Sequence, residues 1–129
     1  SEASTASEAS ALRTNFSWFA LMFAVNHGVV TTPLIISTSV LQPEVGYMGN
    51  ALINVATVTT ALLFAAPTAS AAGLRGALLL GMALYCTYTA LFAVAAVAES
   101  DSMMQWTAFC AGSAVGGVAA GGVWTAPGG

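Results

Sequence analysis

The chain has 129 residues, of which 57% are hydrophobic and 5% are charged, and its formal net charge is −3. A soluble domain carries about 25% charged residues, so seven charged side chains cannot form a water-soluble coat. The chain has two arginines and no lysine, which argues against electrostatic binding of nucleic acid. The composition therefore indicates an integral membrane protein.

The charged residues divide the chain into four uncharged stretches. One charged side chain at the centre of a membrane helix costs about 2.5–3.5 kcal/mol, so the charges mark segments outside the hydrocarbon. The uncharged stretches are residues 14–43, 45–74, 76–98 and 102–129. A helix needs about 20 apolar residues to cross a bilayer core, and each of these stretches is longer than that. The sequence predicts an all-α fold, a polytopic integral membrane bundle of four transmembrane helices.

The first ten residues are small and polar, and they include two acids, Glu2 and Glu8. We predict a flexible polar tail over residues 1–14 and a four-span transmembrane domain over residues 15–129. The missing initiator Met also fits a mature N-terminus left after removal of a targeting peptide.

Each predicted span is a helix, because every backbone N–H and C=O in hydrocarbon needs a partner within its own segment. The spans are predicted at residues 16–38, 47–66, 76–98 and 103–125. The short connections make consecutive spans antiparallel neighbours. Arg13 and Arg75 then lie on one side of the membrane, and the acids Glu44, Glu99 and Asp101 lie on the other. The positive-inside rule predicts both termini on the cytoplasmic or stromal side.

Asn26 and His27 lie near the middle of the first span, followed by Gly28 and Pro33. Polar side chains at this depth are candidates for function. Three interpretations of His27 remain open: a hydrogen bond to a neighbouring helix, a place on a substrate or proton path, and ligation of a metal such as the magnesium of chlorophyll. Gly28 would leave room for a flat ring, and Pro33 removes a backbone hydrogen bond.

Polar residues also line the second and third spans. Asn50 and Asn54 are four residues apart, so they share one face of a helix. Tyr85 and Tyr88 form a similar stripe on the third span. We expect both stripes to make hydrogen bonds between helices.

The fourth span is rich in glycine at spacings of four. Small residues at that spacing form a smooth groove that another helix can approach closely. The neighbour is another span of this chain, another protein, or a flat ligand such as a pigment or a lipid. The glycines are Gly112, Gly116, Gly117, Gly121 and Gly122.

The sequence shows no machinery for catalysis. It has no nucleophile–base pair, no paired catalytic carboxylates, no phosphate-binding loop and no zinc spacing. We therefore expect a protein that is not an enzyme, with chlorophyll, carotenoid or lipid as the candidate ligands at the helix surface.

Several segments carry a likeness to a known family: Leu41–Gly49, Ala61–Leu63, Gly73–Gly81, Tyr85 and Gly121–Ala126. They resemble the first four helices of a major facilitator superfamily protein, in the branch related to the uncoordinated-movement regulators of potassium channels. The segment GLRGALLLG is similar to that superfamily's loop between helices 2 and 3, without its acidic and additional basic residues. Pro127 stands where the branch has Gln. The resemblance implies the first third of a major-facilitator-like fold.

Two functions follow from these observations. Such transporters have about twelve spans in two halves, with substrate sites between the halves. Because four spans cannot build that cavity, we expect a non-catalytic integral membrane subunit docked on a larger membrane complex. Its partners would be the lipid bilayer and other membrane subunits. A photosystem-type assembly of the plastid thylakoid is the example we favour, because photosynthetic complexes carry small, charge-poor helical subunits. The alternative is an N-terminal fragment of a major-facilitator-like transporter.

Overall fold

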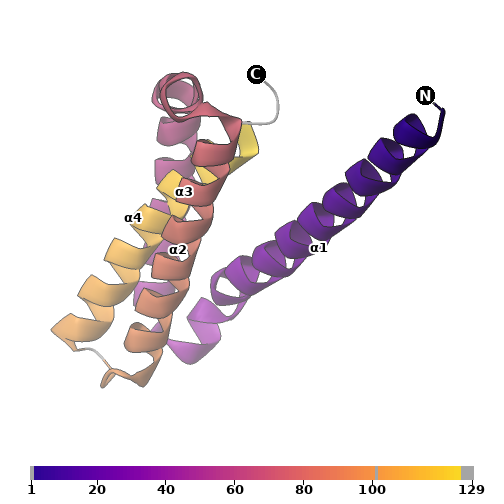
Figure 1. Cartoon of the computed structure of the whole chain (residues 1–129). Coiled ribbons are helices and arrows are strands. Elements are labelled where there is room, and N and C mark those ends of the chain that lie inside the picture. Colours follow the sequence, from indigo (N-terminus) through magenta and orange to yellow (C-terminus); the bar gives the residue numbers. More distant parts are fainter. Residues whose placement is uncertain (1, 101, 126–129) are drawn as a thin grey trace.

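The computed structural model describes residues 2–100 and 102–125. It contains four helices: α1 (Glu2–Val40), α2 (Pro43–Leu63), α3 (Ala65–Val97) and α4 (Met103–Thr125). Figure 1 shows α2, α3 and α4 packed together, with α1 leaning away from them. The described residues are thus all-helical or in short links, and the predicted all-α fold is confirmed.

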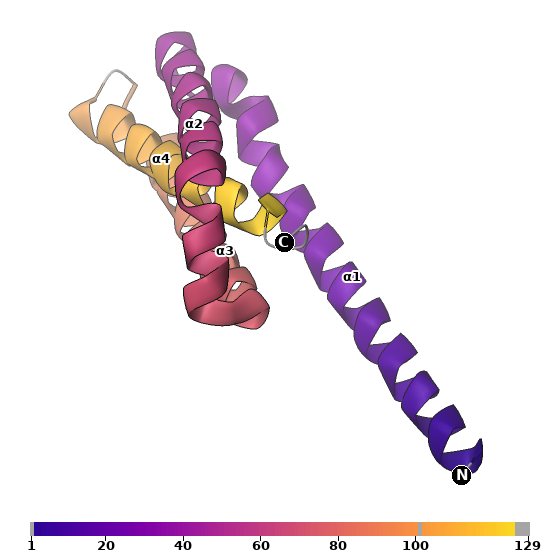
Figure 2. The same ribbon diagram turned by 90° about the horizontal axis from the view of Figure 1, so that it is seen from above.

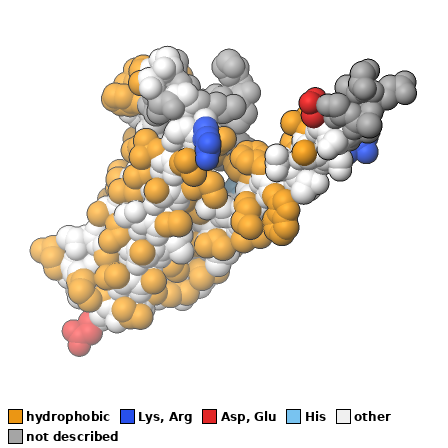
Figure 3. Space-filling model, in the orientation of Figure 1, with side chains coloured by type: hydrophobic (Ala, Val, Ile, Leu, Met, Phe, Trp, Pro, Cys, Tyr) orange, Lys and Arg blue, Asp and Glu red, His pale blue; other side chains and the backbone are white. Residues whose placement is uncertain are grey.

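Three of the four helices are long and apolar enough to cross a membrane. They are the stretches Ser7–Val40, Arg75–Val97 and Met103–Val123. Helix α2 has 21 residues, which is sufficient length. It is not among the three because Glu44, Asn50 and Asn54 make it more polar. Figure 3 shows hydrophobic side chains over much of the visible surface, as a lipid environment requires.

Helix α1 begins much earlier than expected. The segment that we predicted as a flexible tail over residues 1–14 is helical from Glu2 onward. Its alanines and glutamates favour helix, and extending an existing helix costs less than starting a new one. The resulting 39 residues would be about 58 Å long at 1.5 Å per residue. This is about twice the thickness of a bilayer core, so α1 must tilt or extend into water.

The link between α2 and α3 is also shorter than expected. We placed a loop at residues 67–75, but only Phe64 separates the two helices. Pro67 is accommodated in the first turn of α3, where backbone N–H groups have no partner within the helix. Gly73 interrupts α3 with φ of 69°, a conformation that glycine adopts without steric cost. The two parts of α3 therefore run in different directions (Figure 2).

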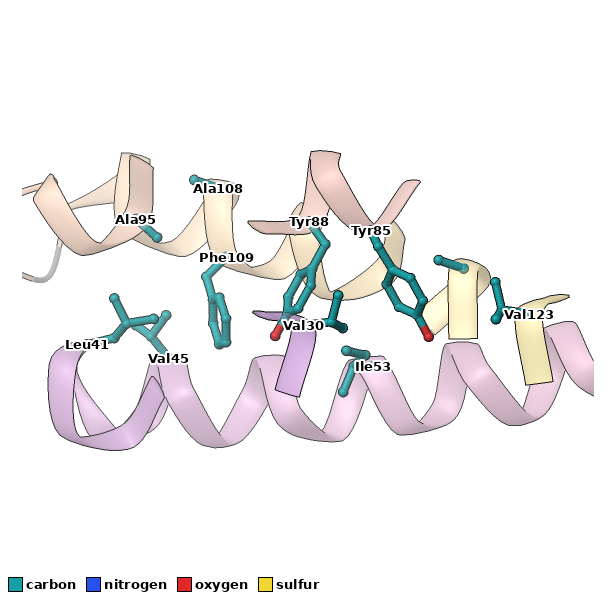
Figure 4. Packing of buried hydrophobic residues seen from close by; sticks show 11 residues of the cluster. Val30, Leu41, Val45, Ile53, Tyr85, Tyr88, Ala95, Ala108, Phe109 and Val123 are labelled. Carbon is teal, nitrogen blue, oxygen red and sulfur yellow. The ribbon is translucent and has the colours of Figure 1, made fainter. Parts of the chain in front are cut away.

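The core lies where α2, α3 and α4 meet. Tyr88, Phe109 and Val45 are fully buried there. The Phe109 ring meets Phe92 edge-on, with 5.8 Å between the ring centroids. In Figure 4 the rings of Tyr85 and Tyr88 extend from α3 toward α2, beside Phe109 of α4. Aromatic rings thus fill the space between the three helices.

Glycines on two faces of α4 allow this close packing. A Cβ atom at Gly117 would lie 2.6 Å from the Ile53 carbonyl oxygen of α2, and one at Gly121 would lie 2.7 Å from that of Thr57. A Cβ atom at Gly116 would lie 2.9 Å from the Tyr88 ring of α3. These distances are too short for a side chain, so α2 and α3 approach α4 closely because glycine is present.

Gly121 and Gly122 provide a matched test of this packing. Gly121→Ala places a methyl group against α2 and should lower the free energy of unfolding by about 1–3 kcal/mol. Gly122→Ala meets no atom within 4 Å, so it should be neutral or stabilise by about 0.5–1 kcal/mol. Unfolding of both variants in detergent, followed by circular dichroism, measures the difference. Equal effects would contradict the glycine-dependent packing.

Candidate functional site

A buried polar contact joins the end of α1 to α2. The Ser37 hydroxyl, which is fully buried, donates to Asn50 Oδ1 at 3.3 Å. The Asn50 amide in turn donates to the Leu34 carbonyl oxygen at 3.2 Å. Just beyond, Gly46 lets the backbones meet, because a Cβ atom there would lie 2.9 Å from Thr38 Cα. These contacts hold the last turns of α1 against α2.

Helix α1 leaves the bundle at Val30. Val30, Pro33 and Ser37 are buried, whereas none of residues 7–29 is buried. Thr31 and Thr32 donate to the carbonyl oxygens of His27 and Gly28 one turn earlier. Such hydrogen bonds bend helices slightly, and Pro33 lacks the N–H that would continue the ladder. The departure from the bundle thus coincides with a weakened part of the helix.

A cavity of about 140 Å³ lies beside this point, with walls from all four helices. It brings together three of the residues selected from the sequence, His27, Asn54 and Tyr85, from three different helices. Its lining residues are His27, Val30, Thr31, Leu34, Ile53, Asn54, Thr57, Tyr85 and Ala120. We call it the polar cavity.

Two of the polar side chains of this cavity donate hydrogen bonds within their own helix. The Asn54 amide donates to the Asn50 carbonyl oxygen, and the Thr57 hydroxyl donates to that of Ile53, both at 2.7 Å. Each hydroxyl retains acceptor lone pairs, and Asn54 retains its carbonyl oxygen and a second N–H. No described Asp, Glu, Lys or Arg lines the cavity. The described residues therefore offer imidazole, amide, hydroxyl and phenol groups at this site, and no carboxylate, ammonium or guanidinium group.

Other predicted residues lie elsewhere. Asn26 faces a separate cavity of about 330 Å³ against α3, which also contains Cys86 and Thr89. Tyr88 belongs to the core, and its hydroxyl has no hydrogen-bond partner among the described residues. Neighbouring residues of one polar stripe therefore have different surroundings. Asn50 makes hydrogen bonds with α1, and Asn54 lines the polar cavity.

The glycines of α4 also separate into two groups. Gly112 and Gly116 lie against α3, and Gly117 and Gly121 lie against α2. Gly122 instead lines an apolar groove of about 430 Å³ between α2, α3 and α4, to which no described residue of α1 contributes. Within this chain, four of the five glycines thus have a helix as neighbour, and the fifth faces open space.

Sequence reasoning missed Ser37 and Thr31 as contributors. A signal was available for Thr31, which lies four residues after His27 and so on the same helix face. Ser37 has the same spacing from Pro33. The described residues contain no group of three or more His, Cys, Asp or Glu arranged to hold a metal ion.

Comparisons with protein-family models, curated proteins and solved structures find no match for this chain. The resemblance to the major facilitator superfamily therefore stays a prediction.

The contact between Asn50 and α1 can be tested by substitution. Asn50→Leu removes both hydrogen bonds to α1 and should lower the free energy of unfolding by about 1–2 kcal/mol, the range found for polar contacts between membrane helices. Thr59→Val is the control, because the exposed Thr59 hydroxyl donates only to Val55 of its own helix, and should change it by less than about 0.5 kcal/mol. Detergent unfolding measures both. An Asn50→Leu effect no larger than the control would contradict the contact.

Proposed function

We propose that this chain is a non-catalytic integral membrane subunit that docks on a larger membrane complex through the N-terminal half of α1. The observation that carries the proposal is the exposure of the part of α1 before Val30. Between residues 7 and 29 only Phe23 and Asn26 are even half-buried. The exposed large apolar side chains are Leu12, Phe16, Trp18, Phe19, Leu21, Met22, Val25 and Val29.

Aromatic content favours a protein partner for this surface over lipid alone. Helix association in membranes depends on van der Waals packing rather than on the hydrophobic effect. Aromatic residues are enriched at protein interfaces, and Phe16, Trp18, Phe19 and Phe23 lie within two turns of one another. Phe19 and Phe23 already stack, with 6.1 Å between the ring centroids. A partner helix would extend this row of rings.

In this proposal α2 is a fourth transmembrane helix, although it is more polar than the others. Its two asparagines have polar surroundings within the bundle, because the Asn50 amide donates to the Leu34 carbonyl oxygen of α1 and Asn54 lines the polar cavity. The first turns of α1 and the last turn of α4 lie toward the same end of the molecule, opposite the end where α1 meets α2 (Figure 1). That arrangement fits four crossings with both termini on the cytoplasmic or stromal side.

Labelling in intact membranes tests the crossing of α2. With Cys86 and Cys110 replaced by Ala, Gln42→Cys and Ser70→Cys should react with a membrane-impermeant maleimide from opposite sides, because α2 separates them. Ser10→Cys should react from the same side as Ser70→Cys. Reaction of positions 42 and 70 from one side would show that α2 does not cross the membrane.

A photosystem-type assembly of the thylakoid remains the complex that we propose first. The supporting argument is the apolar groove beside Gly122, whose 430 Å³ volume lies within the usual range for ligand sites. It offers a place for part of a carotenoid, a chlorophyll or a lipid between the subunit and its neighbour. Pigment analysis of the complex that co-purifies with the chain distinguishes these ligands.

The polar cavity favours a second candidate, an N-terminal fragment of a major-facilitator-like transporter. Transporters place substrate sites near the middle of the bilayer, between helices. His27, Asn54 and Tyr85 line the polar cavity, and Asn54 and Tyr85 lie near the middle of α2 and of the apolar part of α3. In this alternative the exposed half of α1 would pack on further helices of the same polypeptide.

Photo-crosslinking at α1 tests docking and separates the two candidates. Benzoylphenylalanine at Phe19 should capture a polypeptide in native membranes, because this side chain faces the proposed partner. Benzoylphenylalanine at Val58, which is similarly exposed on α2, is the control and should capture mainly lipid. Mass spectrometry identifies the captured sequence. A different protein supports the docked subunit, and a later segment of the same gene product supports the transporter. Equal capture at both positions would overturn the docking surface.

A further inference from the structure

We propose that Asn26 of α1 is the polar anchor of the docking surface and binds an asparagine or glutamine side chain from a transmembrane helix of the partner. The proposal rests on the docking through α1 proposed above, and it names the chemistry that the partner must carry. Asn26 lines the cavity of about 330 Å³ between α1 and α3, which we call the α1–α3 cavity.

The Asn26 side chain differs from the other asparagines of the predicted spans. The Asn50 amide donates to the Leu34 carbonyl oxygen, and the Asn54 amide donates to the Asn50 carbonyl oxygen. The half-buried Asn26 side chain makes no hydrogen bond with any residue that the structure describes. Its carboxamide therefore keeps its acceptor oxygen and both of its N–H donors for another group.

Asn26 lies near the middle of the membrane in the proposed arrangement. The α1–α3 cavity is also lined by Cys86, the central residue of the apolar helix Arg75–Val97. The polar groups of lipids lie at the two faces of the bilayer and its core holds no bulk water, so neither reaches a side chain at this depth. An amide without a hydrogen-bond partner in hydrocarbon is strongly unfavourable. Another protein can supply that partner.

Asn26 also continues the aromatic row of the docking surface. Phe19, Phe23 and Asn26 are spaced by four and three residues, so they lie on one face of α1. Phe23 packs at the edge of the core, so this face is turned toward the angle at which α1 leaves the bundle (Figure 2). Small side chains form most of the α3 wall of the cavity: Cys86, Thr89, Ala90 and Ala93. Such side chains let another helix approach closely, so a helix lying along the row would reach Asn26.

The chemistry of this place selects a second carboxamide. An asparagine or glutamine side chain has both a donor and an acceptor, so it can answer both functions of Asn26. Hydroxyl groups on membrane helices are often used within their own helix, as Thr87 and Thr89 donate to the carbonyl oxygens of Ala83 and Tyr85. No described Asp, Glu, Lys or Arg lines the α1–α3 cavity, so a charged side chain would enter without an opposite charge, at a high cost.

Photo-crosslinking at two positions of α1 in native membranes tests the anchor. Benzoylphenylalanine at Phe19 and at Val29, which is exposed and lines the α1–α3 cavity, should capture the same partner helix. Because Asn26 lies between these positions, the two captured residues should bracket an asparagine or a glutamine. A captured helix without either residue in that interval would overturn the proposal, and so would capture of lipid alone at Val29. Capture of no protein at Phe19 would remove the docking surface itself, and the anchor with it.

Substitutions provide the matched comparison. A variant and the unmodified chain, with different tags and with benzoylphenylalanine at Phe19 in both, are expressed together and compete for the partner. Asn26→Leu should lower its share of the crosslinked product about fivefold, the factor that a net hydrogen bond of about 1 kcal/mol between membrane helices produces. Asn26→Gln should restore most of that share.

Thr87→Val is the control, because the exposed Thr87 hydroxyl donates only within α3, and its share should equal that of the unmodified chain. An unchanged share for Asn26→Leu, with capture at Phe19 intact, would refute the anchor and leave the docking surface standing. Circular dichroism checks that each variant folds. The helix captured by the unmodified chain decides the question even where a variant does not fold.

Discussion

The close approach of α2 and α3 to α4 is the constraint on which the rest of the structure depends. Lipid surrounds an apolar helix as readily as another helix does, so association must come from packing and polar contacts. Gly117 and Gly121 on one face of α4 bring it against the backbone of α2, and Gly116 on another face leaves room for the Tyr88 ring of α3. Once α2 and α3 are fixed in this way, Asn54 and Tyr85 line one cavity beside α1. The polar cavity therefore depends on the glycines of α4, which lie far from His27, Asn54 and Tyr85 in the sequence.

Helix α1 is held by different forces, and only over part of its length. Its last turns use hydrogen bonds through Ser37 and the backbone contact at Gly46, whereas the part before Val30 has almost no buried side chain. Segments with few buried apolar contacts open at lower free-energy cost than the core. The bundle thus combines a closely packed three-helix unit with a helix that is anchored at one end. Such a division suits a protein that uses one helix for contacts outside its own fold.

The sequence predicts the helices well and their surroundings less well. Gaps between charges located the apolar stretches, because charge is excluded from hydrocarbon, and α4 begins and ends where we predicted. Local composition misplaced the link after α2, since Pro67 is tolerated in a first helical turn and a single residue, Gly73, changes the direction of α3. Spacing placed Asn50 and Asn54 on one face, but which partner each meets depends on how α1 crosses α2. That crossing is set by tertiary contacts, which one-dimensional patterns do not contain.

The departure of α1 at Val30 connects the proposed docking surface with the polar cavity. By leaving the bundle there, α1 exposes its aromatic row to a partner and also leaves the polar cavity open beside His27. A partner that drew the first half of α1 toward the bundle would narrow that opening, and one that held it outward would keep the opening accessible. Pro33 and the threonines before it lie at the point where such a change in orientation costs least.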